Sequence, residues 1–340
     1  MNAAQGAWPV YSLYGITLTG NFPFTTPLSP AVLPIVSPSV LQVICVTSPP
    51  LDLDWTQLRP VALSRTRLAN GEPWLTCYEV GECEVRRIAH IADFYLYHER
   101  ILCHILAPEK MIDAEIALLG AILARWLERR GTAMLHASAV ATEAGAVAFL
   151  ATSQSGKSTL AASFVDAGYA LLTDDILPVE QRDDAVLAAP GYPQMRMWPE
   201  VAAHFLGEYE HLPLVHPAAN KRRVRLGAAH WGVFCLHPQP LAAIYLPERG
   251  DAGMADAAIT IAPCGRAEAL FTLSAHSFAG PHVNSIVRQQ QRIALLRTVV
   301  QRVPVYRLRY PSGYAHLPAV RQAILANLES MPHRRLHPVP

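Results

Sequence analysis

A lysine and a serine stand next to each other after a short run of small polar residues, and this combination is typical of loops that bind phosphate groups. Residues 151–158 read A-T-S-Q-S-G-K-S, which agrees with seven of the eight positions of the phosphate-loop template G-x-x-x-x-G-K-[ST]. In such a loop, backbone N–H groups and the start of the next helix form an anion site, the lysine contacts the terminal phosphates and the serine hydroxyl ligates Mg²⁺. The sequence therefore predicts a site for ATP and Mg²⁺ made of Ser153, Gln154, Ser155, Gly156, Lys157, Ser158 and Thr159.

The segments on either side of this loop are those that the template requires. The apolar run 146–150 predicts a strand before the loop, and residues 158–167 predict a short helix after it. Ala151 replaces the first glycine of the template, and its methyl group stands where glycine permits left-handed or crowded backbone, so some loss of nucleotide affinity is expected. The alternative interpretation is a strand-to-helix turn that binds no ligand.

Two adjacent carboxylates follow the next predicted strand. The helix is followed by Gly168 and by the strand 169–173, which can run parallel to 146–150 through a right-handed crossover. Asp174 and Asp175 then emerge at the carboxyl edge of the sheet, where open α/β sheets bind ligands. Such a pair can divide two tasks, one carboxylate holding the metal and the other accepting a proton from an attacking hydroxyl. The alternative is an acidic turn at a strand end.

A histidine is expected at the mouth of the same loop. If residues 142–145 form a four-residue turn, Ala141 faces Ala146 and His136 faces Ala151. His136 can then orient the catalytic carboxylate or bias its protonation. The alternative is a histidine in the core or on the surface without a role in chemistry.

Basic residues further along the chain are secondary candidates. Arg196 lies in a turn-rich segment and can stabilise transferred charge as an arginine finger does. Lys221 and Arg222 begin the densest basic run, which can close over phosphates or bind a substrate carboxylate. The alternatives are a structural arginine and a solvated charged face.

The elements that must position these residues divide the chain in two. Residues 1 to about 60 carry many prolines between short β-branched and aromatic runs, which predicts irregularly joined strands, and strand-like alternation continues through FYLYHERILCHIL. A helical period from Ile112 to Trp126, closed by Gly131, predicts one long helix. We therefore expect a β-rich N-terminal domain over 1–130 and an α/β domain over 131–330, giving an α+β protein overall.

Composition limits the class of protein. A formal net charge of +1 and 16% charged residues give no reason to expect nucleic acid as a partner. The six cysteines contain no CxxC pair, four-ligand zinc spacing is absent, and the N-terminus has no secretory signal. No uninterrupted apolar stretch is long enough for a membrane span, so a cytoplasmic protein is expected. The oligomeric state stays open, a homo-oligomer included.

The run LHASAVATEAGAVAFLATSQSGKSTLAASFVDAGYALLTDD resembles the HPr kinase/phosphorylase superfamily of P-loop kinases, over about residues 131–200. The resemblance implies a kinase core related to phosphoenolpyruvate carboxykinase, with ATP and Mg²⁺ as cofactors. It assigns Asp175 as the base for an acceptor serine and His136 as its partner. It also implies Ser158 and Asp174 at the metal.

Three further segments resemble the relatives that phosphorylate lasso-peptide precursors: LHASAV, PGYPQMRMWPE and ANKRR. The resemblance implies transfer of phosphate to the C-terminal serine of a precursor peptide. The glycine-rich signature that HPr enzymes carry after the aspartates is not evident, which disfavours HPr as the acceptor. Two alternatives remain: a serine kinase acting on HPr or another carrier protein, and a sensor that binds nucleotide without transferring phosphate.

Overall fold

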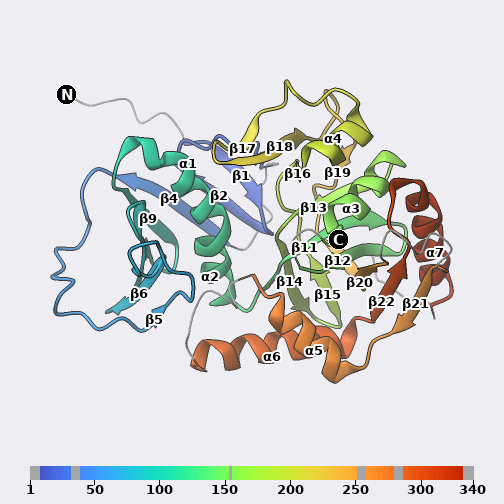
Figure 1. Ribbon diagram of the computed structural model, residues 1–340. Coiled ribbons are helices and arrows are strands. Elements are labelled where there is room, and N and C mark those ends of the chain that lie inside the picture. The colour runs from blue at the N-terminus through green and yellow to red at the C-terminus, as the bar shows by residue number, and fades with distance from the viewer. Residues whose placement is uncertain (1–7, 32–38, 153–154, 251–257, 279–285, 332–340) are drawn as a thin grey trace. The chain divides into compact units, whose positions relative to one another are not determined.

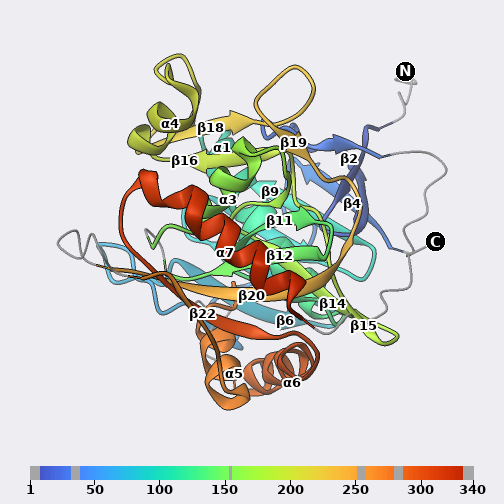
Figure 2. The same cartoon turned by 90° about the vertical axis from the view of Figure 1, so that its right-hand side faces the viewer.

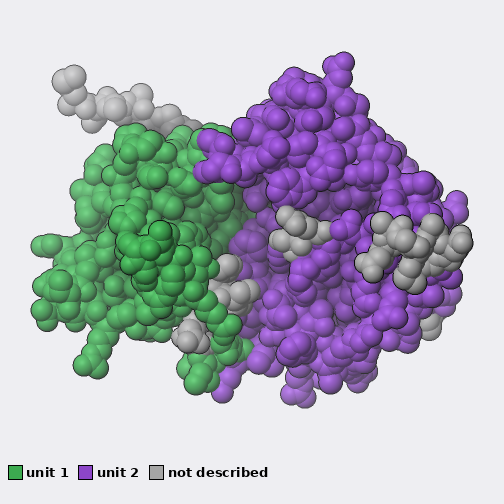
Figure 3. Space-filling view, viewed as in Figure 1, with its two compact units in different colours: residues 1–129, 279–289 green, residues 130–278, 290–340 purple. Residues whose placement is uncertain are grey.

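The structure is a computed structural model that describes residues 8–31, 39–152, 155–250, 258–278 and 286–331. It contains both helices and β-sheets and divides into two compact units (Figure 3). Unit 1 comprises residues 1–129 and 279–289, and unit 2 comprises residues 130–278 and 290–340.

Unit 1 is built on one nine-stranded sheet with the order β3-β1-β2-β4-β9-β8-β7-β6-β5 (Figure 1). Its strands are β1 Val10–Leu13, β2 Ile16–Gly20, β3 Ser29–Pro30, β4 Val40–Val46, β5 Ala62–Leu63, β6 Leu75–Val80, β7 Cys83–Ile88, β8 Ala92–Leu96 and β9 Arg100–Ile105. The short strands among the prolines are the irregularly joined ones that the sequence predicts.

The long helix predicted after these strands is interrupted in its middle. It consists of η1 Pro108–Lys110, α1 Met111–Ala117, the π-helical segment η2 Leu118–Ile122 and α2 Leu123–Glu128. Gly120 has non-helical backbone angles of φ −97° and ψ −106°. The Arg86 side chain, buried in β7, donates to the Ala121 carbonyl at 2.8 Å. A helical hydrophobic period does not reveal such a break, because apolar side chains on both sides of it are still buried.

Unit 2 contains a ten-stranded sheet that runs β10-β14-β15-β20-β12-β11-β13-β19, with β22 beside β20 and β21 beside β22. Its strands are β10 Ala133–Leu135, β11 Ala137–Thr142, β12 Gly145–Leu150, β13 Ala170–Thr173, β14 Leu177–Arg182, β15 Ala185–Ala188, β19 Val233–Phe234, β20 Gln239–Arg249, β21 Thr260–Pro263 and β22 Val305–Tyr310. A separate three-stranded sheet has the order β16-β18-β17, with β16 Gln194–Met197, β17 Leu214–His216 and β18 Ala219–Arg225.

Helices cover both faces of the large sheet (Figure 2). The helices of this part of the chain are α3 Lys157–Asp166, α4 Pro199–Leu206, α5 Arg266–Ala275, α6 Ile286–Arg302, η3 Tyr314–His316 and α7 Leu317–Glu329, of which α4 lies beside β16 and β18 of the small sheet. Phe149 of β12 packs in the core with α3 and α7, whereas its neighbour Leu150 packs in the core with α5 and α6. Strand β12 is buried on both faces, so it reads as an unbroken apolar run.

The topology brings four strand ends to one edge of the sheet. Strand β12 pairs in parallel with β20, and β20 pairs in parallel with β22. Strand β11 is antiparallel to both β12 and β13, so β13 also runs in the direction of β12, with β11 between them. The segments that follow these strands therefore meet at the carboxyl edge, which is where ligands of α/β sheets bind.

The hairpin β11–β12 has the predicted register, with Ala141 opposite Ala146. The stretch 134–141 before this turn, however, is not one continuous strand, because it is divided at His136. Its first part, β10, pairs with β14, whereas its second part, β11, pairs with β12 and β13. The His136 backbone N–H donates to the His276 carbonyl at 2.8 Å instead of joining a ladder. This break places the His136 side chain just beyond the end of the hairpin.

Candidate active site

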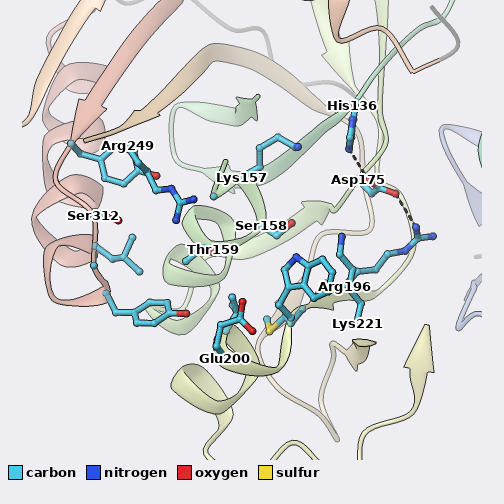
Figure 4. Close-up of a pocket in the computed structure, with 18 residues that line it drawn as sticks. His136, Lys157, Ser158, Thr159, Asp175, Arg196, Glu200, Lys221, Arg249 and Ser312 are labelled. Carbon is cyan, nitrogen blue, oxygen red and sulfur yellow. Dashed lines mark hydrogen bonds and ion pairs between the residues drawn. The ribbon is translucent and has the colours of Figure 1, made fainter. Parts of the chain in front are cut away.

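A pocket of about 590 Å³ opens at the carboxyl edge of the unit 2 sheet, and all of its lining residues belong to unit 2 (Figure 4). Of the residues predicted from the sequence, the lining includes His136, Gly156, Lys157, Ser158, Thr159, Asp175, Arg196 and Lys221. The remaining lining residues are Met197, Trp198, Glu200, Val201, Arg249, Tyr310, Ser312, Gly313, Tyr314 and Leu317.

Helix α3 starts at the phosphate-loop motif. Gly156, its N-cap, has φ +95°, a left-handed backbone that favours glycine. The first N–H groups of α3 have no partner within the helix, and together with the helix dipole they favour an anion at this position. Ser155 lies beside Thr152, with 2.5 Å between their hydroxyl oxygens. Ser153 and Gln154 lie outside the described residues.

The Lys157 ammonium is held next to the loop. Lys157 is 6% exposed, and its Nζ donates to the Ala151 carbonyl at 2.8 Å and to the Thr152 carbonyl at 3.2 Å. Burial lowers the pKa of Lys157, although the nearby charges of Asp175 and Asp174 act in the opposite direction. A phosphate group in the pocket would act in the same direction as these carboxylates, and would therefore stabilise the charged lysine.

The backbone at Ala151 does not need a glycine. Among the described residues other than glycine, positive φ angles occur only at Tyr14, His90, Asp175 and Asp183. Ala151 therefore has a backbone conformation open to any residue, and its carbonyl accepts the bond from Lys157. The left-handed conformation that motivated the expected loss of nucleotide affinity is absent at this position.

Asp174 lies behind Ser158. Asp174 is 5% exposed and does not line the pocket. Its Oδ1 accepts hydrogen bonds from the Ser158 hydroxyl at 2.8 Å and the Ser138 hydroxyl at 2.6 Å, and its Oδ2 accepts from the Arg196 backbone N–H at 2.9 Å. Because the Ser158 hydroxyl donates its proton to Asp174, the lone pairs of its oxygen remain available.

These oxygens fit a magnesium ion. No group of three or more His, Cys, Asp or Glu side chains suited to a metal occurs in the described ranges. Mg²⁺, however, is usually held by one or two protein oxygens together with substrate phosphates and water. Ser158 would be its direct ligand, and Asp174 would orient the Ser158 hydroxyl and act through it or through water.

Asp175 is fixed between a histidine and an arginine (Figure 4). Its Oδ1 lies 3.0 Å from His136 Nε2, and its Oδ2 accepts from the Arg196 guanidinium at 2.9 Å. The second guanidinium nitrogen donates to the Tyr192 hydroxyl at 2.8 Å. Asp175 has φ +80°, a conformation that aspartate adopts more readily than most residues but that is still uncommon. Backbone strain of this kind is concentrated at functional sites.

The environment of Asp175 favours its charged form. Burial on its own would raise the pKa of the carboxyl group, but the Arg196 guanidinium and then the His136 hydrogen bond more than offset it. The net result is a pKa well below the usual range. Asp175 is therefore a carboxylate at neutral pH, able to accept a hydrogen bond from an incoming hydroxyl.

The basic run on β18 divides between two faces of its sheet. Lys221 lines the pocket with its Nζ 5.2 Å from the centre of the Trp198 ring. Arg222 does not line the pocket, since it donates to the Leu212 carbonyl at 3.2 Å and lies over the Tyr209 ring. Alternation along a strand explains the difference, because neighbouring side chains point to opposite faces.

Several residues of the site were missed by the sequence analysis. Ser138 could have been found, because it lies two residues after His136 and period-two alternation puts both on one side of a strand. Arg249 is the last residue of β20, and Tyr314 follows the carboxyl end of β22. Their position depends on the parallel pairing of β12, β20 and β22, which no local pattern encodes.

No membrane-spanning candidate occurs among the described helices, none of which is both long and apolar enough.

Comparisons with known proteins give limited information on this chain. No protein-family model matches the sequence, and no curated protein is similar to it. Among the solved structures that are similar is the HPr(Ser) kinase/phosphatase from Coxiella burnetii, at 10% sequence identity and a TM-score of 0.31. The similarity covers 58% of this chain and 97% of that one. It resembles this chain in part of its fold only, so activity has to be inferred from the geometry of the pocket.

Proposed function

We propose that the protein is a kinase that uses ATP and Mg²⁺ to phosphorylate a serine hydroxyl of a peptide, the C-terminal serine of a lasso-peptide precursor. One observation carries the proposal. The start of α3 with Lys157 and Ser158 lines the same pocket as the carboxylate of Asp175 (Figure 4). A phosphate-binding loop and a fixed carboxylate that face one cavity are the parts that phosphoryl transfer requires.

Each residue has a task in this reaction. The loop amides and Lys157 bind phosphate, while Ser158, oriented by Asp174, holds the metal. Mg²⁺, when bound, neutralises charge on the phosphate oxygens. Asp175 accepts the proton of the serine hydroxyl while the serine oxygen bonds to the γ-phosphorus and the bond to the β–γ bridging oxygen breaks. The products are phosphoserine and ADP.

Positive charge on the acceptor side of the pocket supports a peptide end as the substrate. Arg196 and Lys221 lie on the same side of the pocket as Asp175 (Figure 4). Arg196 is engaged with Asp175, whereas the contact of Lys221 is with the Trp198 ring. A free C-terminal carboxylate next to the reacting hydroxyl is a group that Lys221 can bind.

The direct test is mass spectrometry of peptides after incubation with the protein, ATP and Mg²⁺. A peptide ending in serine should gain one phosphoryl group. The same peptide ending in alanine should not, and the form with an amidated C-terminus should react more slowly because Lys221 loses its anion. Phosphorylation of HPr alone would instead identify a carrier-protein kinase, and ATP binding without any phosphorylated product would identify a nucleotide sensor.

Arg196 should control the charge of Asp175 in the free protein. Arg196→Gln removes the strongest of the interactions that lower the pKa of Asp175, so its carboxyl group should titrate at higher pH. Carboxyl ¹³C NMR of metal-free and nucleotide-free protein measures this directly. Arg182→Gln, which removes an exposed arginine paired with Glu180 outside the pocket, should leave Asp175 unchanged. An unchanged Asp175 titration in Arg196→Gln would show that Arg196 does not hold the carboxylate.

A further inference from the structure

The pocket continues past the phosphate loop, away from Asp175. In Figure 4, Arg249 and Ser312 lie on the opposite side of Lys157 from His136 and Asp175. Arg249 is the last residue of β20, and Ser312 follows the end of β22. The lining continues through Tyr314 into the start of α7. Glu200, in the first turn of α4, lines the same pocket from another element. This end of the cavity has no task in the binding of phosphate or acceptor described above.

Arg249 lies directly over the beginning of α3. A Cβ atom placed on Gly156 would lie 3.4 Å from the Arg249 Cδ and 3.1 Å from the Tyr310 hydroxyl. A guanidinium at this place is repelled by the positive end of the helix dipole. An anion bound at the helix start converts this repulsion into a favourable contact, and Arg249 can donate two parallel hydrogen bonds to a phosphate.

Tyr314 offers a flat aromatic surface next to this arginine. Its ring is stacked on the His204 ring, with centroids 4.0 Å apart and planes 9° apart, and Phe205 packs against its edge. The histidine supports one face of the tyrosine, and the tyrosine lines the pocket. Burial raises the pKa of Tyr314, the Glu200 charge raises it further and the Arg249 charge lowers it. The charges of a carboxylate and a guanidinium, both on residues that line the same pocket, thus act on this tyrosine.

These groups match the parts of a nucleoside. An aromatic ring held on one face stacks on a base, a carboxylate accepts hydrogen bonds from the two ribose hydroxyls, and a guanidinium binds the phosphate nearest to the sugar. The acceptor carboxylate Asp175 lies on the other side of the phosphate loop. A nucleotide that points its base toward Tyr314 therefore directs its terminal phosphate toward Asp175.

We propose that the end of the pocket formed by Tyr314, Glu200 and Arg249 is the nucleoside site, which fixes the direction in which ATP lies across the phosphate loop. The inference rests on the proposed function, since it takes ATP as the ligand. Tyr314 stacks on the base, Glu200 binds the ribose hydroxyls and Arg249 binds the phosphate next to the ribose.

The test compares two ligands by calorimetry in the presence of Mg²⁺: ATP, and inorganic tripolyphosphate, which has the phosphates without the nucleoside. Tyr314→Leu should weaken ATP on the order of tenfold and leave tripolyphosphate unchanged, because stacking involves the base alone. Glu200→Gln should remove the preference for ATP over 2′-deoxy-ATP. Arg249→Met should weaken both ligands.

Matched controls lie outside the pocket. Tyr209→Leu changes a half-buried tyrosine and Arg309→Met an exposed arginine, neither of which lines the cavity, so both should bind ATP as the unchanged protein does. Thermal unfolding confirms that each variant folds. Equal losses of ATP and tripolyphosphate in Tyr314→Leu, or no loss of either, would overturn the nucleoside site. Failure of the unchanged protein to bind tripolyphosphate and ATP at all would instead overturn the phosphate loop, and with it the proposed function.

Discussion

Replacing Asp175 by asparagine is expected to reduce phosphoryl transfer by about three orders of magnitude and to leave the dissociation constant of ATP within about twofold. Asparagine keeps the shape of the side chain and tolerates the left-handed backbone at φ +80°, so the site should keep its geometry. The amide, however, cannot accept the proton that leaves the serine hydroxyl. Single-turnover kinetics with a serine-ended peptide measures transfer, and calorimetry measures ATP binding.

Asp183→Asn is the matched control for this substitution. Asp183 also has a left-handed backbone, at φ +50°, but it is exposed in the turn between β14 and β15 and does not line the pocket. Its replacement should leave transfer and binding unchanged. If Asp175→Asn retains a tenth or more of the activity, Asp175 is not the base. If it loses ATP binding as well, its main task is structural.

Electrostatic interactions connect phosphate binding at Lys157 with the basicity of Asp175. Without a ligand, Asp175 is neutralised by Arg196, and Lys157 donates to backbone carbonyls. Phosphate in the pocket attracts both cations, so Arg196 can move from the carboxylate to the phosphate. The carboxylate would then be a stronger base at the moment when the acceptor is present. In the proposed reaction, the contact that lowers the pKa of Asp175 in the free protein would therefore restrain transfer until substrate binds.

Local patterns predict the elements on either side of the loop, and the hairpin, well. The strand before the loop, the helix after it and the Ala141–Ala146 pairing follow from a short stretch in which turn length fixes register. The direction of β13 was also predictable, because a short helix and Gly168 leave a right-handed crossover as the favoured connection. The strand β11 between β12 and β13 was not, since order within a sheet depends on long-range packing.

The features missed by the sequence share a physical cause. His136 interrupts a strand because β10 and β11 pair with different partners, β14 and β12, and no property of residues 133–142 reports this. Arg249 and Tyr314 reach the pocket through two parallel pairings, of β20 with β12 between residues 96 apart in sequence (Phe149 and Tyr245) and of β22 with β20 between residues 61 apart (Ile244 and Val305). Contacts between distant segments are set by the packed core, so the end of the pocket that we propose as the nucleoside site becomes visible only in three dimensions.

Lys157→Met should weaken both ATP binding and transfer, in contrast to Asp175→Asn, which should reduce transfer alone. A charged hydrogen bond contributes roughly 1.5–3 kcal/mol. Its loss should therefore make the dissociation constant of ATP about tenfold to hundredfold larger. Methionine matches the length and volume of the lysine, and Lys157 is buried, so a charge is removed without a cavity. The chain has two other lysines, and Lys110→Met, at a half-exposed lysine paired with Asp113 in unit 1, is the control that should change neither quantity. Calorimetry with ATP measures the dissociation constant of Lys157→Met. A value within twofold of that of the unchanged protein would mean that the loop at Lys157 does not bind the phosphates.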